Sequence, residues 1–490
     1  MPDGMAELSR EVGRLIGAIE AEGAARATGW ARCIERPEFA PCARNLADYI
    51  ALRHHDVRPL QRRLMALGLS SLGRLESRVM PTFAAVRASL AAIAGGDLLP
   101  RPTEQEFFAG EQLLEEAAVA IFGPANPRRP VAMLVTCPTE AADDPSFMMR
   151  LAKLRVESVR INCAHDDPGR WERMIAHARA AEAATGHRLR VFMDLAGPKI
   201  RTGAVRPAEG AERATAGARL AIVPPGTLDA VADHGCFAAE CTLPEAVAAA
   251  KVGERLFVDD GKIAARIAAV EPWGLVADIV AAADRGVRVK PEKGLNFPDT
   301  SFRVAALTAK DMADLDFVAT HADGLGYSFV QSAEDVALLQ DALASRRPDG
   351  GRGLALILKI ETPRAVAALP DIVVRAAGRQ PTAVMIARGD LAVEIGFARL
   401  AEMQEEILWI GEAARVPVIW ATQVLEHLIR KGTPSRGEMT DAAMSARAEC
   451  VMLNKGPFLF EAIAELDTLL ERMAGNQRKK TPQLRRLHSW

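Results

Sequence analysis

The sequence lacks several features that mark whole classes of protein. It has no uninterrupted apolar stretch long enough to span a bilayer, and it does not begin with a basic segment followed by a short apolar one. Its 61 Lys and Arg residues nearly balance its 63 Asp and Glu residues, so no large net charge favours nucleic acid or a membrane surface as a partner. These absences predict a cytoplasmic protein that acts on a small molecule.

Cysteine is also scarce. The 7 cysteines are odd in number and follow neither metal-ligand nor disulfide-framework spacing, which predicts free thiols. The phosphate-binding motif GxxxxGK[ST] is absent, so any nucleotide must be held without a P-loop. What the sequence does have is length and apolar content: 490 residues, 49% of them hydrophobic, are enough to build several packed cores.

From residue 131 onward, short β-branched runs alternate with segments of helical periodicity. A series of eight such repeats predicts an α/β fold, a (β/α)₈ TIM barrel whose active site lies at the C-terminal ends of its strands. The predicted strands are Val131 to Cys137, Ser158 to Asn162, Arg190 to Leu195, Gly324 to Phe329, Leu354 to Glu361, Ala383 to Asp390, Pro417 to Gln423 and Cys450 to Asn454.

Other parts of the chain have a different composition. Short strands punctuated by Gly and Pro predict a small antiparallel β domain, a lid, inserted after the third barrel strand. The first part of the chain is rich in Ala, Leu, Arg and Glu, with helical patterning over 46–67, 75–94 and 105–121. The predicted domains are a helical extension (1–128), a barrel (129–203 and 294–475), the inserted lid (204–293) and a mobile basic tail (476–490).

Two features of the extension allow alternative interpretations. The Arg-bearing stretch 58–79 can be interpreted as a helix-turn-helix, but a basic helix alone is weak evidence for nucleic-acid binding, which favours a helical hairpin whose basic face is solvated or docked on the barrel. The run His54, His55 and Asp56 suggests a metal site, but adjacent histidines on a helix point in different directions, which favours a solvated pair.

Two neighbouring barrel strands carry acids at their ends. The runs ending at Glu361 and Asp390 are separated by a helix-sized segment, and a right-handed crossover places such strands side by side. Carboxylate oxygens on one rim suit Mg²⁺, which takes one or two protein carboxylates and leaves its other positions to water and substrate. Lys359 shares a strand face with Glu361, so the sequence predicts a site for phosphoryl groups.

An ordered series of motifs resembles the pyruvate kinase family over residues 129 to 472. The order of the motifs, and the position of the insertion after the third strand, match that family as well. The motifs are VRINCAH (159–165), VFMDLAGPKIRTG (191–203), FVDDG (257–261), KGLNFP (293–298), LTAKD (307–311), LKIET (358–362), MIARGDLAVEIG (385–396) and IWATQVLEHLI (419–429).

The resemblance implies a glycolytic phosphotransferase that moves the phosphoryl group of phosphoenolpyruvate to ADP. It places Mg²⁺, or Mn²⁺ in its stead, on Glu361 and Asp390, and Lys359 and Arg160 on the phosphoryl group. Removal of Lys359 is then expected to stop transfer and leave the fold intact; the simpler alternative is a structural salt bridge. Thr422 would assist protonation of the enolate by water, although a threonine there can also cap the next helix.

The family's remaining binding positions also have counterparts. The substrate carboxylate would lie against the backbone of Ala387, Arg388, Gly389 and Asp390, which leads into a helix. The nucleotide would contact residues of the barrel mouth and of the lid. Those residues are Asn162, His165, Arg201, Asp260 and Lys293.

The monovalent-cation position departs from the family pattern. Many members hold K⁺ with Asn, Ser, Asp and a Thr carbonyl, where this chain has Asn162, Ala164, Asp194 and Leu195. In the GPxI motif the usual Glu is replaced by Lys199, which in the family accompanies independence from K⁺. The ammonium group would supply the positive charge that the ion otherwise provides, so no K⁺ requirement is expected. The alternative is a surface lysine at the hinge of the lid.

Further departures leave other functions open. The family's SGETAKG loop after the eighth strand is shortened here to a segment containing Asn454 and Lys455, the stretch 435–444 follows the family only in part, and the family's C-terminal effector domain has no counterpart. The alternatives to a pyruvate kinase are a relative that binds phosphoenolpyruvate or another 2-oxo acid enolate for different chemistry, and a non-catalytic sensor or interaction protein. A homo-oligomer formed through the barrel or the extension is expected.

Overall fold

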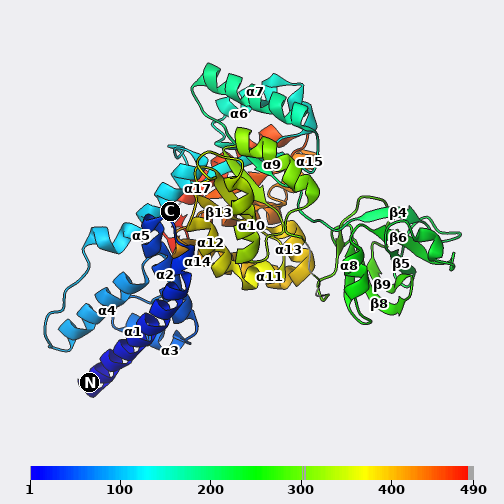
Figure 1. Ribbon diagram of the computed structural model, residues 1–490. Coiled ribbons are helices and arrows are strands. Elements are labelled where there is room, and N and C mark those ends of the chain that lie inside the picture. The colour runs from blue at the N-terminus through cyan, green and yellow to red at the C-terminus, as the bar shows by residue number, and fades with distance from the viewer. Residues whose placement is uncertain (1, 301, 303–304, 484–490) are drawn as a thin grey trace.

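The computed structural model describes residues 2–300, 302 and 305–483, and its centre is a closed barrel of parallel strands (Figure 1). Around the barrel the strands follow the order β1-β15-β14-β13-β12-β11-β3-β2. Each predicted run overlaps one of these strands, so the predicted TIM barrel is confirmed. The strands are β1 (Ala132–Thr136), β2 (Ser158–Asn162), β3 (Arg190–Asp194), β11 (Gly324–Tyr327), β12 (Ala355–Ile360), β13 (Thr382–Ala387), β14 (Val418–Ala421) and β15 (Cys450–Leu453).

Helices cover the outside of the barrel. Several begin with a capping box, in which a Ser or Thr side chain and an acid three residues later each accept a bond from the other's backbone N–H; Thr308 with Asp311 is one example. The helices are α6 (Pro145–Lys153), α7 (Pro168–Thr185), α9 (Ala309–His321), α10 (Ala333–Ala344), α11 (Pro363–Ala367), α12 (Leu369–Ala377), α13 (Arg388–Ile395), α14 (Phe397–Ala414), α15 (Glu426–Lys431), α16 (Arg436–Met444) and α17 (Leu459–Ala474).

The lid is a separate sheet with its own core, and it stands to one side of the barrel (Figure 1). The sheet is mixed rather than purely antiparallel as predicted, because β5 and β6 pair in parallel. Residues 224–236 between these two strands are long enough to return the chain in the same direction. The lid contains α8 (Pro244–Ala249) and the strands β4 (Thr202–Arg206), β5 (Arg219–Val223), β6 (Phe237–Cys241), β7 (Arg255–Val258), β8 (Ile263–Glu271), β9 (Gly274–Ala282) and β10 (Leu295–Asn296).

The N-terminal extension is helical, as predicted, but its helices are divided differently. The predicted helix over 46–67 is two helices: the first ends at Arg53, and the second begins at Arg58 with Pro59 in its first turn, where a missing N–H costs nothing. No helix occurs over 67–78, where a helix-turn-helix would need one, so that interpretation is wrong. His54 pairs with Glu22 at 2.8 Å. The helices are α1 (Pro2–Trp30), α2 (Ala40–Arg53), α3 (Arg58–Ala66), α4 (Val79–Ile93) and α5 (Glu104–Phe122).

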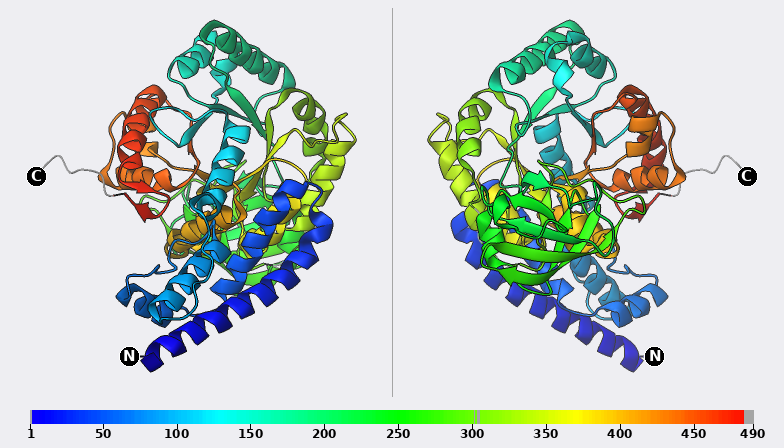
Figure 2. Two further views of the ribbon diagram at one scale, coloured as in Figure 1. Left: turned by 90° about the vertical axis from the view of Figure 1, so that its left-hand side faces the viewer. Right: turned by 90° about the vertical axis from the view of Figure 1, so that its right-hand side faces the viewer.

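The extension closes the N-terminal end of the barrel. Ile121 and Phe122, at the end of α5, belong to one buried cluster with side chains inside the barrel, and the ring of Phe122 meets that of Phe192 edge-on at 6.0 Å. Ala355 and Cys450, the first residues of their strands, belong to the same cluster. Figure 2 shows the extension across this end, with the lid beyond the opposite end. The extension therefore does not reach the strand ends where chemistry is expected.

A buried asparagine joins the extension to the barrel. The Asn45 amide donates to the carbonyl oxygens of Glu76, at 2.7 Å, and of Ala413 in α14, at 2.8 Å. Its side-chain oxygen accepts from the N–H of Val79, the first residue of α4, at 3.1 Å. One side chain thus satisfies buried backbone groups on three segments.

We expect Asn45→Ala to lower the free energy of unfolding by about 2–4 kcal/mol, because it leaves these buried groups unpaired. The measurement is the urea midpoint followed by circular dichroism. Gln112→Ala, on the exposed face of α5, is the matched control and should change little. An Asn45→Ala midpoint equal to that of the wild type would show that the extension does not depend on this contact.

The end of the described chain packs on the protein. Residues 477–482 form a short antiparallel pair, β16 (Gln477–Arg478) and β17 (Thr481–Pro482). Lys479 donates to Glu449 at 2.5 Å, and Lys480 forms an ion pair with Glu76 of the extension. The predicted mobile tail is therefore ordered up to residue 483, and its remainder, 484–490, lies outside the described residues. Within the described residues, no helix is both long enough and apolar enough to cross a membrane.

Candidate active site

The two predicted metal-binding acids lie at the C-terminal ends of adjacent strands. β12 and β13 pair in parallel up to Ile360 and Ile386, so Glu361 follows directly after the first strand and Asp390 lies in the first turn of α13 after the second. Glu361 is 3% exposed and accepts from the N–H of Phe329 at 2.5 Å. Burial raises the pKa of Glu361, Lys359 opposes this shift, and the negative charge of Asp390 adds to it. The two carboxylates therefore share one site.

Lys359 lies at the centre of a buried network. Its ammonium donates to the Ser328 hydroxyl at 2.7 Å and lies 3.2 Å from Glu361 and 3.5 Å from Asp194. Ser328 in turn donates to the Leu195 carbonyl at 2.8 Å. Burial alone would lower the pKa of Lys359, but the two carboxylates outweigh it and raise that pKa. The raised pKa keeps the lysine charged, and its three contacts make a larger network than the single structural salt bridge that was the alternative.

Arg160 joins this network from β2. Its Nε donates to Asp194 at 2.7 Å, and one of its terminal nitrogens lies 3.4 Å from the Thr136 hydroxyl. Asp194 is 1% exposed; burial alone would raise its pKa, but Arg160 and Lys359 together lower it. Charged side chains of β2, β3 and β12 therefore alternate in sign at the barrel mouth.

Thr422 lies beside the loop that carries Asp390. It follows β14 with φ of 69°, a conformation that a β-branched residue rarely adopts and that usually accompanies a functional constraint. A Cβ on Gly389 would lie 2.8 Å from the Thr422 methyl carbon, so the Thr422 side chain can pack this closely on the backbone of residue 389 only because that residue is glycine. The next helix, α15, has Leu425 at its N-cap, so Thr422 does not cap it.

The Arg388 side chain is engaged inside the protein. It donates to the carbonyl oxygens of Ala421, at 2.8 Å, and Thr422, at 2.6 Å, and it pairs with Asp441 of α16. These bonds hold the β13 and β14 loops together. The Arg388 guanidinium is therefore occupied by these bonds. At the start of α13, only the backbone groups of Ala387 and Arg388 are available to contact a substrate.

Lys199 has a different partner from the one its predicted role suggests. Its ammonium donates to Asp390 at 2.7 Å and lies 3.9 Å from Asp260 of the lid. The Asn162 side chain accepts from the N–H of Ala164, and Asp194 is engaged by Arg160 and Lys359. The lysine therefore links the lid hinge to the acid pair.

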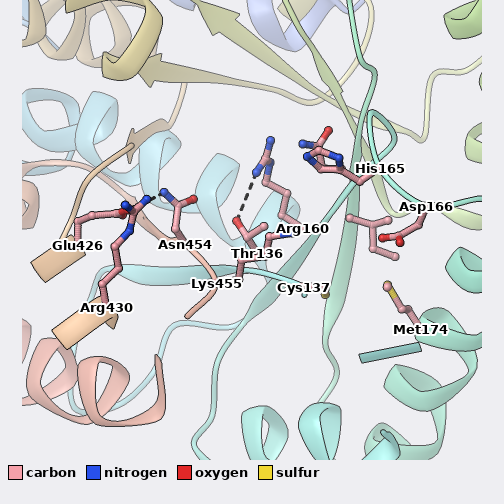
Figure 3. A pocket seen from close by; sticks show the side chains of 12 residues that line it. Thr136, Cys137, Arg160, His165, Asp166, Met174, Glu426, Arg430, Asn454 and Lys455 are labelled. Atoms are coloured by element: carbon pink, nitrogen blue, oxygen red, sulfur yellow. Dashed lines mark hydrogen bonds and ion pairs between the residues drawn. The ribbon is translucent and has the colours of Figure 1, made fainter. Parts of the chain in front are cut away.

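The remaining predicted nucleotide residues divide between the lid and a pocket. In the lid, Lys293 lies 3.3 Å from Asp259, Arg201 donates to the carbonyl oxygen of Glu292 at 3.1 Å, and Asp260 is largely exposed. Asn162 and His165 line a pocket of about 340 Å³ next to Arg160 (Figure 3). Burial lowers the pKa of His165, and the charge of Lys455 lowers it further.

Several participants were not identified from the sequence. Ser328 and the N–H of Phe329 follow β11, and Asp441 lies on α16; no local motif distinguishes any of them. Ser328 carries one recognisable signal, because it lies at the C-terminal end of a predicted barrel strand, where functional residues are expected.

A sequence model of the family described as "pyruvate kinase, barrel domain" matches residues 118–458. The matched region is more than half of the chain and includes every barrel strand and the lid. The chain belongs to the pyruvate kinase family. Most of the N-terminal extension lies outside the region that the family model matches.

Individual proteins named pyruvate kinase are similar to this chain. One from Agrobacterium vitis is 31% identical over 350 residues, covering 70% of this chain and 69% of the relative. One from Corynebacterium efficiens is 33% identical over 313 residues, 63% of this chain and 61% of the relative. One from Mycobacterium tuberculosis is 32% identical over 320 residues, which cover 65% of this chain and 63% of the relative. The chain thus spans between 61% and 69% of the length of these relatives.

Proposed function

We propose that this protein is a pyruvate kinase, which transfers the phosphoryl group of phosphoenolpyruvate to ADP and produces pyruvate and ATP in glycolysis. The observation that carries the proposal is the convergence of two carboxylates, Glu361 and Asp390, and two cations, Lys359 and Arg160, at one end of the barrel. Phosphoryl transfer needs mainly positioning and neutralisation of charge, and this arrangement offers both.

The acid pair fits a divalent metal ion. Glu361 and Asp390 are hard oxygen ligands at one site, and their mutual repulsion, which contributes to the raised pKa of Glu361, would be relieved by a cation. We propose that they hold Mg²⁺, with Mn²⁺ as a substitute. The ion would supply positive charge to the oxygens of the transferred group.

The chain's own residues account for the other requirements. The charged Lys359 and Arg160 would contact the oxygens of the phosphoryl group while its bond to the enol oxygen breaks and its bond to the terminal ADP oxygen forms. Backbone N–H groups of residues 387–390 would hold the substrate carboxylate at the start of α13. Thr422 would orient a water that delivers a proton to C3 of the enolate, because a threonine hydroxyl is too weak an acid to act alone.

The nucleotide would lie between the barrel mouth and the lid. Asn162 and His165 line the pocket beside Arg160, while Arg201, Asp260 and Lys293 extend from the lid and its hinge. Lid closure would bring these two groups toward one another and exclude water from the transfer step.

The direct test is a coupled assay with phosphoenolpyruvate, ADP and Mg²⁺, in which lactate dehydrogenase reports pyruvate. Pyruvate formation that requires all three components is expected. An inactive protein that still binds phosphoenolpyruvate in calorimetry would instead indicate a relative with different chemistry, and one that binds neither substrate would indicate a sensor or interaction protein.

We expect activity without added K⁺. The Lys199 ammonium already places a fixed positive charge 2.7 Å from Asp390, beside the proposed metal site. Replacing KCl by tetramethylammonium chloride at equal ionic strength should leave the rate unchanged. A collapse of the rate in the tetramethylammonium salt, restored by K⁺, would contradict this expectation and leave Lys199 as a hinge residue.

We further propose that the protein is cytoplasmic and forms a homo-oligomer through the barrel or the extension. We also propose that the chain divides into four regions: the extension (1–128), the barrel (129–203 and 294–475), the lid (204–293) and the tail (476–490). The ends of the lid sheet, Thr202 and Asn296, lie within three residues of its predicted boundaries. Light scattering of the purified protein tests the oligomer.

A further inference from the structure

Two chain segments, 199–202 and 293–295, connect the lid to the barrel (Figure 1). They run side by side in opposite directions, and an antiparallel bridge joins Arg201 of the first to Gly294 of the second. A Cβ on Gly294 would lie 3.2 Å from a side-chain carbon of Lys199, so the lysine packs closely on the returning segment. These two segments form the hinge of the lid, and a contact beside them lies close to the axis about which the lid turns.

Asn296 directly follows the hinge and connects the lid to the barrel. It is the last residue of β10, at the edge of the lid sheet, and it is 8% exposed. Its side-chain amide donates to the Glu394 carboxylate at 2.8 Å. Glu394 lies on α13, four residues after Asp390, so the two acids lie on one side of that helix. A side-chain hydrogen bond therefore joins the lid sheet to the helix that carries a proposed metal ligand.

The strand that contains Asn296 also supports the loop of the lid that faces the nucleotide. Asn296 pairs with Phe257 of β7 in antiparallel register, and β7 leads directly toward Asp260. A Cβ on Gly261 would lie 3.8 Å from a side-chain carbon of Val393, which places this loop next to α13. The position of Asp260 relative to α13 therefore follows from where β10 is held.

The bond between Asn296 and Glu394 involves a partly buried charge. Burial raises the pKa of Glu394, the hydrogen bond from Asn296 opposes this shift, and the charge of Asp390 adds to it. Arg255 and Asp299 act on Glu394 with opposite signs, and they pair with each other at 2.6 Å, so their effects largely cancel. The Asn296 amide is thus the neighbour that contributes most to stabilising the carboxylate, and hydrogen bonds to a charged group are the stronger kind.

We propose that Asn296 and Glu394 form a pivot that positions the lid over the barrel mouth for nucleotide binding. The inference rests on the proposed function, in which the lid and its hinge contact ADP through Arg201, Asp260 and Lys293. A bond beside the hinge moves little when the lid turns, so it can persist during closure and fix the axis of the motion. Without the bond the lid occupies more orientations, and the fraction that is competent to bind ADP falls.

The pivot should affect one substrate and not the other. The proposed contacts of phosphoenolpyruvate come from the barrel, so its binding does not depend on the orientation of the lid. Saturating ADP selects the competent orientation, so the turnover rate at saturation is also preserved. Asn296 and Glu394 are therefore positioning residues, which act through the lid and not on the reacting atoms.

The test measures both Michaelis constants of Asn296→Ala in the coupled assay, and its ADP affinity by calorimetry. We expect the KM for ADP to rise about 10- to 100-fold, the ratio that corresponds to one hydrogen bond to a charged group. The KM for phosphoenolpyruvate and kcat should stay constant. Asn296→Asp keeps the shape of the side chain but sets a carboxylate against Glu394, so it should weaken ADP binding at least as much.

Two further variants separate the hydrogen bond from general damage. Glu394→Gln keeps a carbonyl acceptor for the Asn296 amide and should retain most of the ADP affinity. The double variant Asn296→Ala with Glu394→Ala should bind ADP no more weakly than Asn296→Ala alone, because both changes remove the same bond. Asn476→Ala, at an exposed position outside the lid and its hinge, is the matched control and should behave as the wild type.

Several results would overturn the inference. They are an unchanged or lower KM for ADP in both Asn296 variants, an equal rise in the two Michaelis constants, full additivity in the double variant, a loss in Glu394→Gln as large as in Asn296→Ala, and a wild type that does not bind ADP. Failure of the proposed function is distinguishable, because a wild type without kinase activity can still lose ADP affinity in calorimetry when Asn296 is replaced.

Discussion

Replacing Lys359 by Met is expected to lower the rate of pyruvate formation by about 10³- to 10⁵-fold, the effect of removing a cation that stabilises charge in phosphoryl transfer. The measurement is kcat in the coupled assay with saturating substrates. Lys359→Arg keeps the charge but not the compact ammonium that fits between Ser328, Glu361 and Asp194, so partial recovery at most is expected.

The same substitution should also destabilise the protein. Glu361 and Asp194 are 3% and 1% exposed, and loss of their lysine leaves buried negative charge with less compensation. Breaking a buried pair in this way costs about 3–5 kcal/mol. The expectation drawn from the sequence alone was that removal of Lys359 leaves the fold intact; the burial of its partners adds an expected loss of stability. Activity must therefore be measured below the melting transition of the variant.

Lys153→Met, at the exposed end of α6, is the control for loss of a lysine elsewhere on the barrel. If Lys359→Met is folded and retains the wild-type kcat, Lys359 does not contact the phosphoryl group, and its role is confined to holding the buried carboxylates.

Glu361→Gln is expected to abolish metal-dependent activity and to weaken Mn²⁺ binding by more than about 10- to 100-fold, the range that follows even the loss of an indirect partner of a metal ligand. The glutamine carbonyl can still accept from the Phe329 N–H, so the loop geometry is preserved while the charge is lost. Binding is measured by electron paramagnetic resonance of free Mn²⁺, which does not depend on turnover.

Glu334→Gln, at the exposed start of α10, is the control for a change of charge on the same barrel. Mn²⁺ affinity unchanged in Glu361→Gln would show that the ion binds elsewhere, and the proposed role of the acid pair would then be wrong. Weaker Mn²⁺ binding without loss of activity would separate the metal site from the transfer step.

The barrel could be predicted because its signal is local. Parallel strands buried on both faces read as short apolar runs, and helical periodicity follows most of them, so each repeat is visible within a short window. The positions of Glu361 and Asp390 followed from the same signal, because both residues lie where a predicted apolar run ends, and such runs end at the rim of the barrel that carries the active site. The lid was visible as a change of pattern, but the parallel pairing of β5 with β6 depends on how a loop returns and was not.

The contacts of the site were less predictable. Lys199 was assigned from its motif to the region of Asn162 and Asp194, yet its ammonium lies 2.7 Å from Asp390, which is 191 residues away in the chain. Ser328 bonds to Lys359 from a different strand, and nothing in its neighbouring residues marks it. Side chains of this kind have several partners within reach, and only the packed structure selects one.

The amino-acid sequence by itself determined the order of strands and helices, the family, and which acids and cations stand at strand ends, because periodicity and motifs are properties of consecutive residues. Tertiary structure alone decided that the extension closes the barrel through Phe122 and that Lys359 contacts two carboxylates and a hydroxyl. It also decided that Lys455 lines the pocket without an ion-pair partner among the described residues. Burial and charge pairing arise between segments far apart in the chain, so they exist only once the chain has folded.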